Sequence, residues 1–457
     1  MLSTIETINQ VVNDFIWGVP AMVCIIGVGF YLSCRTGFLQ IRKFSYAIQT
    51  TIGRMFRKRN ASDGALTPFQ AVCTALAATV GTGNIAGVAG AIAIGGPGAV
   101  FWMWLTAIIG SSTAFIEATL AQLYKEKDPL YGGYRGGPAY YIHHYIERKR
   151  GGAPRRYSIL AVLFALSGLI CWCGISQVIS NSVASSFQNA FHIPPIYSTL
   201  ILVVLAAVIV LRKNATVKVL DVLVPIMAAC YFIMTVFLIL LNLDQIPAVF
   251  SRIFSEAFGL RQIAAGGFGA VVMNGVKRGL FSNEAGSGSA PCAAAAANTN
   301  HPAAVGLVQA LGVFIDTIVI CSCTAFIILL VPEEITAGLA GMDLMQAAMN
   351  YHVGGFGVVF IAVILWLFSF STFIGILFYA RSNVAYLFGD NWASQTAYKV
   401  LALIMLFIGG LAAYTFVWDL GDVGVGLMTV FNLAILFPLS GEALASLRDY
   451  ENTYKKK

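Results

Sequence analysis

Long apolar stretches follow one another along nearly the whole chain, separated by short polar segments. A helix of about 20 apolar residues is long enough to cross the hydrocarbon core of a bilayer. By this measure the pattern predicts eleven membrane-spanning helices. They cover residues 14–34, 66–95, 98–124, 157–187, 196–211, 217–241, 262–298, 303–331, 355–388, 396–417 and 423–446.

The stretch 66–95 is apolar at both ends but carries the sequence TVGTGN at residues 79–84 in its middle. Each glycine weakens a helix by about 1 kcal/mol relative to alanine, and two Thr and one Asn add side-chain oxygens at the same depth. Unwound backbone in a membrane is tolerated only where it faces protein or a water-filled cavity. We therefore predict that this helix breaks here and binds something small. The alternative is close helix packing through the small residues Gly83 and Gly87.

A second stretch, 262–298, is interrupted by GLFSNEAGSG at residues 279–288. Ser282 or Asn283 is predicted to cap a second half-helix whose first turn carries Glu284. The N-terminal end of a half-helix attracts carboxylates, and the carbonyls at a C-terminal end attract cations.

The two interrupted stretches are the second and the seventh of eleven, so each opens a set of five spans. Because five is odd, the second set starts from the opposite side of the membrane. Corresponding broken helices in an inverted repeat indicate a secondary transporter with its site near the bilayer midplane. We divide the chain into an extra helix with a basic linker (1–60), two five-helix repeats (61–245 and 246–447) and a basic tail (448–457).

The composition supports this fold class. Of 457 residues, 58% are hydrophobic and 11% are charged, and the mean hydropathy is +0.78. A soluble domain has about 45–50% apolar and about 25% charged residues. A soluble enzyme and a disordered chain are thereby excluded, which leaves an all-α polytopic membrane protein. The nine cysteines are odd in number and form no C-x-x-C motif, so we interpret them as small buried residues.

The net charge of +7 is explained by where the basic residues lie. With eleven spans, 23 of the 28 Lys and Arg fall on one side of the membrane, most of them in the loops 35–60 and 125–156. Basic loops stay in the cytoplasm. We expect the N-terminus outside, the C-terminus in the cytoplasm, and no nucleic-acid partner.

The segment 131–150, YGGYRGGPAYYIHHYIERKR, is both aromatic and basic. This pattern is typical of an interfacial helix on the cytoplasmic face. An ordinary solvated loop with a basic end fits it equally well.

Three motifs together resemble the alanine/glycine:cation symporter family, also called sodium:alanine symporters. They are TVGTGN at 79–84, GGPGAVFWMW at 95–104 and GLFSNEAGSG at 279–288. The resemblance extends over essentially the whole chain and implies a LeuT-type fold, with one extra helix before the two repeats. It also implies uptake of alanine or glycine across the plasma (inner) membrane, with Na⁺ or H⁺ as coupling ion and no organic cofactor.

The resemblance implies where the ions bind. In LeuT-type carriers, carbonyls of the first core helix and two adjacent hydroxyls of the eighth bind sodium, and an Asn binds a second sodium. The matching residues here are Ala77, Val80, Asn84, Phe368, Ser371 and Thr372. For the two hydroxyls, hydrogen bonding back to carbonyls of their own helix is the alternative.

The resemblance also implies a substrate site around the two breaks. The residues that we assign to it are Thr79, Gly81, Thr82, Gly83, Cys173, Gln177, Gly279, Phe281, Ser282, Asn283 and Ile376. Phe281 and Ile376 are expected beside the substrate side chain. Gln177 lies one turn after Cys173 on one helix face, and a hydrogen bond to a neighbouring helix is its equally weighted alternative role.

Lys277 and Arg278 lie at apparent membrane depth just before the second break. Buried cations are costly and are normally paired. We predict gating or coupling ion pairs with Glu284, Asp316 or Glu117 as partners. Asp316 has a second candidate role, as a cation ligand or proton carrier.

Two other functions fit less well. One is a LeuT-fold carrier for a nucleobase or a larger amino acid. The other is a channel or membrane scaffold, which has no need of an inverted repeat. An enzyme is not expected, because the chain contains no H-E-x-x-H or G-x-S-x-G motif. We expect a functional monomer in the lipid bilayer.

Overall fold

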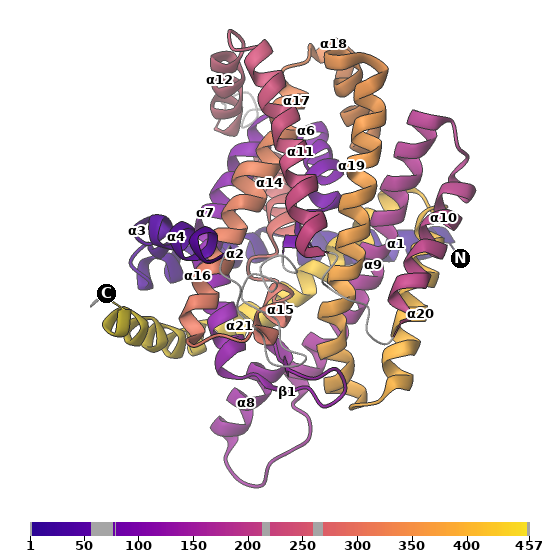
Figure 1. Cartoon of the computed structure of the whole chain (residues 1–457). Helices are drawn as coiled ribbons and strands as arrows, with labels where there is room; N and C mark the ends of the chain where they lie inside the picture. Colours follow the sequence, from indigo (N-terminus) through magenta and orange to yellow (C-terminus); the bar gives the residue numbers. More distant parts are fainter. Residues whose placement is uncertain (1, 56–75, 78, 213–219, 259–267, 455–457) are drawn as a thin grey trace.

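The computed structural model describes residues 2–55, 76–77, 79–212, 220–258 and 268–454. These residues form a bundle of helices around a buried core (Figure 1). Within them, seven helices are long and apolar enough to cross a membrane, or eight if the first two helices, bent by 41°, are one span. The chain is therefore a multi-pass helical membrane protein, and the count of eleven spans stays a prediction.

The helices of the first half of the chain are α1 (Leu2–Ile16), α2 (Val19–Arg35), α3 (Leu39–Arg42), α4 (Phe44–Met55), the π-helix η1 (Gly83–Gly87), α6 (Val88–Gly95), α7 (Gly98–Leu123), α8 (Pro138–Arg150), α9 (Ile159–Phe191), α10 (Pro195–Val210) and α11 (Leu220–Leu241). Those of the second half are α12 (Ile246–Ala257), α14 (Phe268–Asn283), α15 (Ala290–Ala296), α16 (Pro302–Val313), the π-helix η3 (Phe314–Cys321), α17 (Ser322–Leu329), α18 (Glu333–Thr336), α19 (Gly341–Phe388), α20 (Trp392–Gly409) and α21 (Tyr414–Tyr454). Two short strands, β1 (Glu126–Lys127) and β2 (Tyr134–Arg135), pair antiparallel.

The predicted boundary between the last two spans is wrong. Helix α20 ends at Gly409 and α21 starts at Tyr414, so the turn falls inside the predicted span 396–417. The turn is itself apolar, and hydropathy therefore does not mark it. Helix α19 also starts well before the predicted span 355–388, with a kink where Gly354 has a φ of 64°.

The segment 131–150 is only partly helical. Helix α8 begins at Pro138, and residues Pro138–Ile142 are buried. Its basic last turn, Arg148–Arg150, extends away from the core. A solvated loop is therefore ruled out, and the helix packs against α9 beneath the bundle.

Helices α9 and α21 approach so closely that their backbones touch. A Cβ atom on Gly174 of α9 would lie 3.0 Å from the Cα atom of Gly421 on α21. One turn further along, Gly424 faces the backbone of Cys171 in the same way. Small residues permit this contact between membrane helices, where van der Waals packing replaces the hydrophobic effect.

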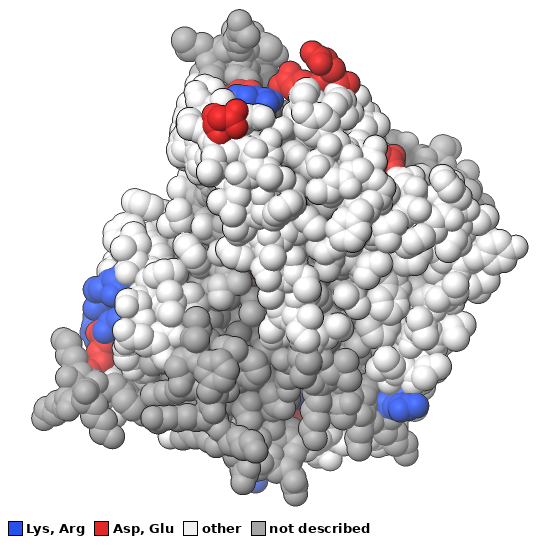
Figure 2. Space-filling model, turned by 45° about the horizontal axis from the view of Figure 1, so that its top comes forward, with Lys and Arg blue, Asp and Glu red and all other residues white. Residues whose placement is uncertain are grey.

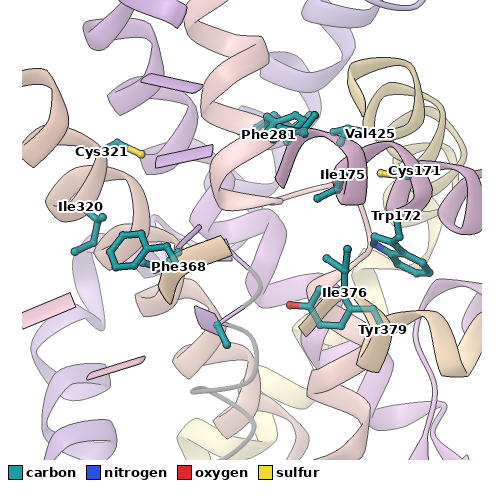
Figure 3. Close-up of a cluster of buried hydrophobic side chains, with 14 of the residues drawn as sticks. Cys171, Trp172, Ile175, Phe281, Ile320, Cys321, Phe368, Ile376, Tyr379 and Val425 are labelled. Atoms are coloured by element: carbon teal, nitrogen blue, oxygen red, sulfur yellow. The ribbon is translucent and has the colours of Figure 1, made fainter. Parts of the chain in front are cut away.

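Buried apolar side chains from several helices gather next to this contact. Figure 3 shows Trp172 and Ile175 of α9 close to Ile376 and Tyr379 of α19, with Phe281 of α14 nearby. On the outside, the face in Figure 2 is mostly uncharged where its residues are described, and its charged residues stand near the edges. Both features suit a protein whose sides face lipid.

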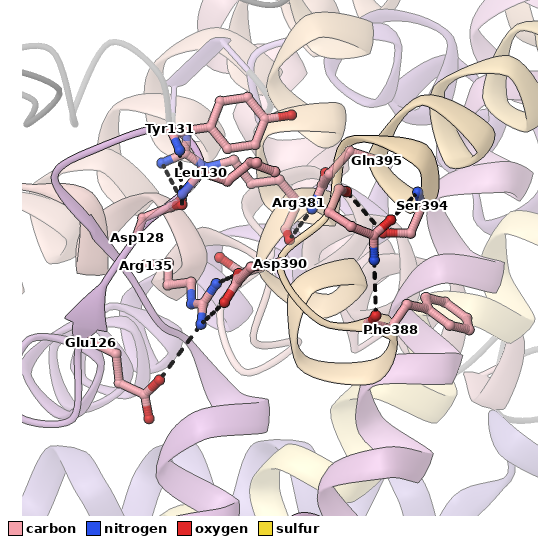
Figure 4. Close-up of polar contacts among 12 residues, drawn as sticks. Glu126, Asp128, Leu130, Tyr131, Arg135, Arg381, Phe388, Asp390, Ser394 and Gln395 are labelled. Carbon is pink, nitrogen blue, oxygen red and sulfur yellow. Dashed lines mark hydrogen bonds and ion pairs between the residues drawn. The ribbon is translucent and has the colours of Figure 1, made fainter.

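A polar network closes the end of the bundle at which β1 and β2 lie (Figure 4). Arg135 binds both carboxylate oxygens of Asp390, in the turn between α19 and α20, and lies 3.9 Å from Glu126. Arg381 of α19 lies 3.7 Å from Asp128, in the loop between β1 and β2. These contacts hold the strand pair against the α19–α20 turn.

One carboxylate, Asp422 of α21, joins three helices. Its two oxygens accept hydrogen bonds of 2.9 Å from Arg278, and Lys277 lies 2.7 Å away. Trp17, directly after α1, donates to the Asp422 carbonyl at 3.0 Å, and Asn13 accepts from Lys277. Lys277 and Arg278 are thus ion-paired as predicted, but the partner is Asp422.

The predicted partners of the two cations are wrong. Within the described residues, no salt bridge joins Lys277 or Arg278 to Glu284, Asp316 or Glu117. Asp422 is separated from Arg278 by 144 residues in the sequence, so local spacing does not reveal the pair.

We predict that Asp422→Ala strongly destabilises the protein. The substitution leaves two cations without their partner, and breaking a buried pair in this way costs about 3–5 kcal/mol. Thermal unfolding of purified variants in detergent measures the effect. Asp449→Ala, on the same helix but with a side chain that is 74% exposed, serves as the control and is expected to change stability much less. Equal melting temperatures for the two variants would contradict the assignment.

Candidate functional site

The first predicted break is present. Leu76, Ala77 and Thr79 are helical, the chain bends at Val80 and Gly81, and helix resumes at Thr82, directly before the π-helix η1. The side chain of Asn84 occupies the break, and its Oδ1 accepts the N–H of Gly81 at 2.7 Å. A backbone group released by the interruption is thus satisfied by a side chain three residues later.

The second break lies slightly later than predicted. Helix α14 ends at Asn283 and α15 begins at Ala290. Ser282 and Asn283 therefore end the first half-helix, and the prediction that they cap the second is wrong. Asn283 instead accepts the N–H of Ala285 at 3.0 Å. The chain turns through left-handed conformations, with φ of 56° at Glu284.

The two breaks meet through one side-chain cluster. Asn84 donates to Ser282 at 3.0 Å and to the Asp316 carboxylate at 2.8 Å. Ser282 donates to the other oxygen of Asp316 at 2.7 Å, and Thr317 donates to that oxygen at 3.1 Å. All four residues are buried. Asp316 lies in the π-helix η3, and π-helical turns are frequent at functional sites.

Close backbone packing leaves little room where the breaks meet. A Cβ atom on Gly83 would lie 3.2 Å from the ring of Phe281. On the other side of the ring, Phe281 stacks against Trp418 of α21, with ring centroids 5.2 Å apart. Arg278 lies over the same Trp418 ring, 4.6 Å from its centroid.

The residues expected to bind sodium lie in two places, some beside the Ala77 carbonyl and Asn84 in the cluster with Asp316. The Thr372 hydroxyl of α19 donates to the Ala77 carbonyl at 3.2 Å, so these two groups are adjacent across the first break. Ser371 donates back to the Phe368 carbonyl of its own helix at 2.9 Å, which is the alternative raised above. Asn84 is occupied by the Asp316 cluster instead.

Several residues expected at the substrate make contacts elsewhere. Cys173 and Gln177 of α9 contact α20, through Tyr398 at 3.9 Å and Met405 at 3.5 Å. Gly279 packs against α7, where a Cβ atom would lie 3.2 Å from the backbone of Met103.

Other expected substrate residues lie at the breaks or beside the buried cluster. Thr82 is hydrogen-bonded to Ser369 of α19 at 2.9 Å. Thr79 lines a small cavity beside the second break. Ile376 is fully buried and lies close to Tyr379 and Trp172 (Figure 3).

A family model described as the sodium:alanine symporter family matches residues 2–457. The chain belongs to the sodium:alanine symporter family. Members of this family are symporters, so the chain is a transporter and not an enzyme. Cation-coupled amino-acid transport is the activity that the family supports.

Curated relatives cover this family member from end to end. A probable sodium/glutamine symporter of Bacillus subtilis (strain 168), GlnT, is 41% identical over 100% of this chain and 92% of its own length. The amino-acid carrier protein AlsT of the same organism is 38% identical over 100% of this chain and 94% of its own. The sodium/alanine symporter AgcS of Methanococcus maripaludis is 36% identical over 97% of each chain.

A solved structure shares the fold of this sodium:alanine symporter family member. The manganese transporter of Eremococcus coleocola, in complex with an aromatic bis-isothiourea compound, matches with a TM-score of 0.52 and 11% identity. The match covers 83% of this chain and 78% of that one. Similarity at this level establishes the architecture of a membrane transporter and nothing about the substrate.

Sequence reasoning missed four polar residues near the breaks of this symporter family member. Thr324 donates to the Asn84 carbonyl at 2.6 Å, and Ser369 is paired with Thr82. Asn432 of α21 binds the carbonyl of Gly286, and Gln309 of α16 lines the small cavity. Each lies in a largely apolar span, and a polar residue there does not by itself show which neighbour it contacts.

We predict that Gly81→Ala lowers the apparent affinity of the transporter for Na⁺. A Cβ atom at this position would overlap the Thr372 hydroxyl and push it away from the Ala77 carbonyl. The Na⁺ concentration for half-maximal uptake is expected to rise about tenfold or more, equivalent to about 1.4 kcal/mol. Gly27→Ala, whose Cβ would meet nothing within 4 Å, is the control. An unchanged sodium requirement would refute the placement of Thr372 at the ion.

Proposed function

We propose that the protein couples inward movement of Na⁺ to uptake of alanine and glycine by alternating access across the plasma membrane. The observation that carries the proposal is the meeting of two helix breaks at the Asn84–Ser282–Asp316 cluster. Unwound backbone beside such a cluster offers the N–H and carbonyl groups that an amino-acid zwitterion and a small cation need.

The first break supplies ligands for both charges of the complex. The amides of Thr82 and Gly83 would bind the substrate carboxylate, and that of Gly81 would join them only by leaving Asn84. The carbonyls of Ala77 and Val80 would bind sodium together with Thr372. The hydrogen bond from Thr372 to Ala77 supports this arrangement, because it brings two oxygen ligands to one place. Ser371 would have to give up its bond to Phe368 to join them.

Substrate size is the second element of the proposal. The close approach of Gly83 to Phe281 supports a site that accepts only small side chains. Among the curated relatives, the name of GlnT specifies glutamine and that of AgcS specifies alanine, so family membership alone leaves the substrate open. A site that excludes larger side chains by contact would favour alanine and glycine.

Sodium entering the cell would supply the driving force. Each elementary charge that moves through the membrane potential gains about 2.3 kcal/mol per 100 mV. The inverted repeats at 61–245 and 246–447 would rock against each other around the occupied site, in a functional monomer with its C-terminus in the cytoplasm.

Uptake of labelled alanine into liposomes that contain the purified protein tests the function. We expect uptake with an inward Na⁺ gradient and none when choline replaces Na⁺ at matched pH. Unlabelled glycine should compete, and glutamine should not. Uptake driven equally by a proton gradient would move the coupling role to Asp316. Absence of alanine uptake from folded protein under both gradients would refute the substrate assignment.

We predict that Asn84→Ala and Gly83→Val each abolish alanine uptake while expression is retained. The first removes the side chain that joins the two breaks, and the second places a branched side chain against Phe281. Gly27→Val is the matched control, since its Cβ would meet nothing within 4 Å. Full uptake in both site variants would overturn the assignment of the breaks as the binding site.

A further inference from the structure

Two buried carboxylates lie next to the second break, apart from the Asn84 cluster. Glu117 is on α7 and is 1% exposed, and Glu284 is the first residue of the break and is 6% exposed. Within the described residues, neither takes part in a salt bridge with Lys, Arg or His. An ionised carboxylate buried without a cation is costly enough that it normally binds a proton or a metal ion.

Glu117 is held in a fixed orientation. One of its oxygens accepts the N–H of Gly286 at 2.9 Å, and the other accepts from the side chain of Asn432 on α21. Asn432 in turn accepts from the hydroxyl of Tyr141 on α8 at 2.5 Å and donates to the Gly286 carbonyl at 2.9 Å. The network places a carboxylate from α7 directly against the backbone of the break.

Glu284 is fixed less completely. Its backbone is left-handed, with φ of 56°, a conformation that non-glycine residues rarely adopt. Its side chain accepts one hydrogen bond from the described residues, from Ser289 at 2.5 Å, and that bond uses only Oε2. A strained backbone of this kind persists only where the contacts of the surrounding structure hold it in place.

Both carboxylates line the same small cavity. Its volume is about 20 Å³, and its walls come from the first broken helix, α7, the second break, α15 and α16. Gln309 of α16 also lines it, is 6% exposed, and its Nε2 atom has no hydrogen-bond partner. A cavity of this size holds one water molecule or one small ion, and it is far too small for an amino acid.

The other charged and titratable groups facing this region leave the carboxylates uncompensated. The described groups that lie close enough to interact with Glu117 or Glu284 electrostatically include no unpaired cation, and they are Tyr141 of α8, Cys171 of α9, Cys292 of α15, Asp316 of η3 and Tyr379 of α19. Arg381 of α19 also faces Cys292, but it is paired with Asp128.

We propose that Glu117 and Glu284 together bind one monovalent cation, a proton or Na⁺, in this cavity, as a coupling-ion site separate from the one at Ala77 and Thr372. The inference rests on the proposed transport function for its coupling role, but binding itself does not depend on the substrate. Because Thr79 of the first break lines the same cavity, the occupant touches both breaks at once.

Two binding measurements on purified wild-type, Glu117→Gln and Glu284→Gln proteins test the site without transport. If the occupant is Na⁺, each variant binds one fewer radioactive Na⁺ per protein at saturation. If it is a proton, the pair shares a single carboxylic-acid C=O stretching band in the infrared spectrum, and each variant shifts or removes that band. Glutamine keeps the size of the side chain. At Glu284 its oxygen can still accept from Ser289, whereas at Glu117 it replaces one of two accepting oxygens by an NH2 group. Glu333→Gln, on the exposed helix α18, is the control that should change neither value.

Unchanged Na⁺ binding together with an unchanged infrared spectrum, in variants that remain monodisperse, would overturn the proposal. Glu284→Gln is the variant more tolerant of substitution, since Glu284 does not hold the Asn432 network. In liposomes, the number of charges moved per alanine is then expected to fall by one in both variants. A protein that binds the cation but carries no alanine would refute the proposed function and leave the site intact.

Discussion

Backbone amides and carbonyls that a broken helix releases inside a membrane must find partners within the protein, since lipid provides none. This requirement organises the centre of the molecule. At the first break, Asn84 accepts the N–H of Gly81. At the second, Glu117 accepts the N–H of Gly286, and Asn432 binds the Gly286 carbonyl. The first role of Asn84, Glu117 and Asn432 is therefore to form hydrogen bonds with unwound backbone.

The same partners connect helices that are distant in the sequence. Asn84 reaches Asp316 in η3, Thr372 reaches the first break from α19, and Asn432 reaches the second from α21. A ligand that takes over one of these hydrogen bonds must therefore disturb contacts between helices. In a carrier this is useful, because binding and rearrangement share the same few bonds.

The sequence predicts the parts of the structure that are local. Glycine and hydroxyl residues inside apolar runs located both breaks, and the length of the runs located α7, α9 and α10. The α20–α21 turn was misplaced because its residues are as apolar as the helices on either side. Asp422 was missed as the partner of Arg278. Gln177 contacts α20, which is the alternative that the sequence left open, and Cys173 contacts the same helix. Which face a single polar residue of a long apolar helix presents depends on tertiary packing, which hydropathy does not contain.

The contacts of the strand pair near α8 depend on the salt concentration of the solution around the protein. It is held to the α19–α20 turn by Arg135 with Asp390 and by Arg381 with Asp128, and the Asp390 side chain is 33% exposed. Dissolved salt screens exposed charges with a screening length near 10 Å at 0.1 M, so it weakens the Arg135–Asp390 pair more than the buried Arg381–Asp128 pair. If this end of the bundle opens by moving the strands, the ionic strength on that one face sets how often it opens. Dissolved salt on that face would then act as a regulator of the transport cycle.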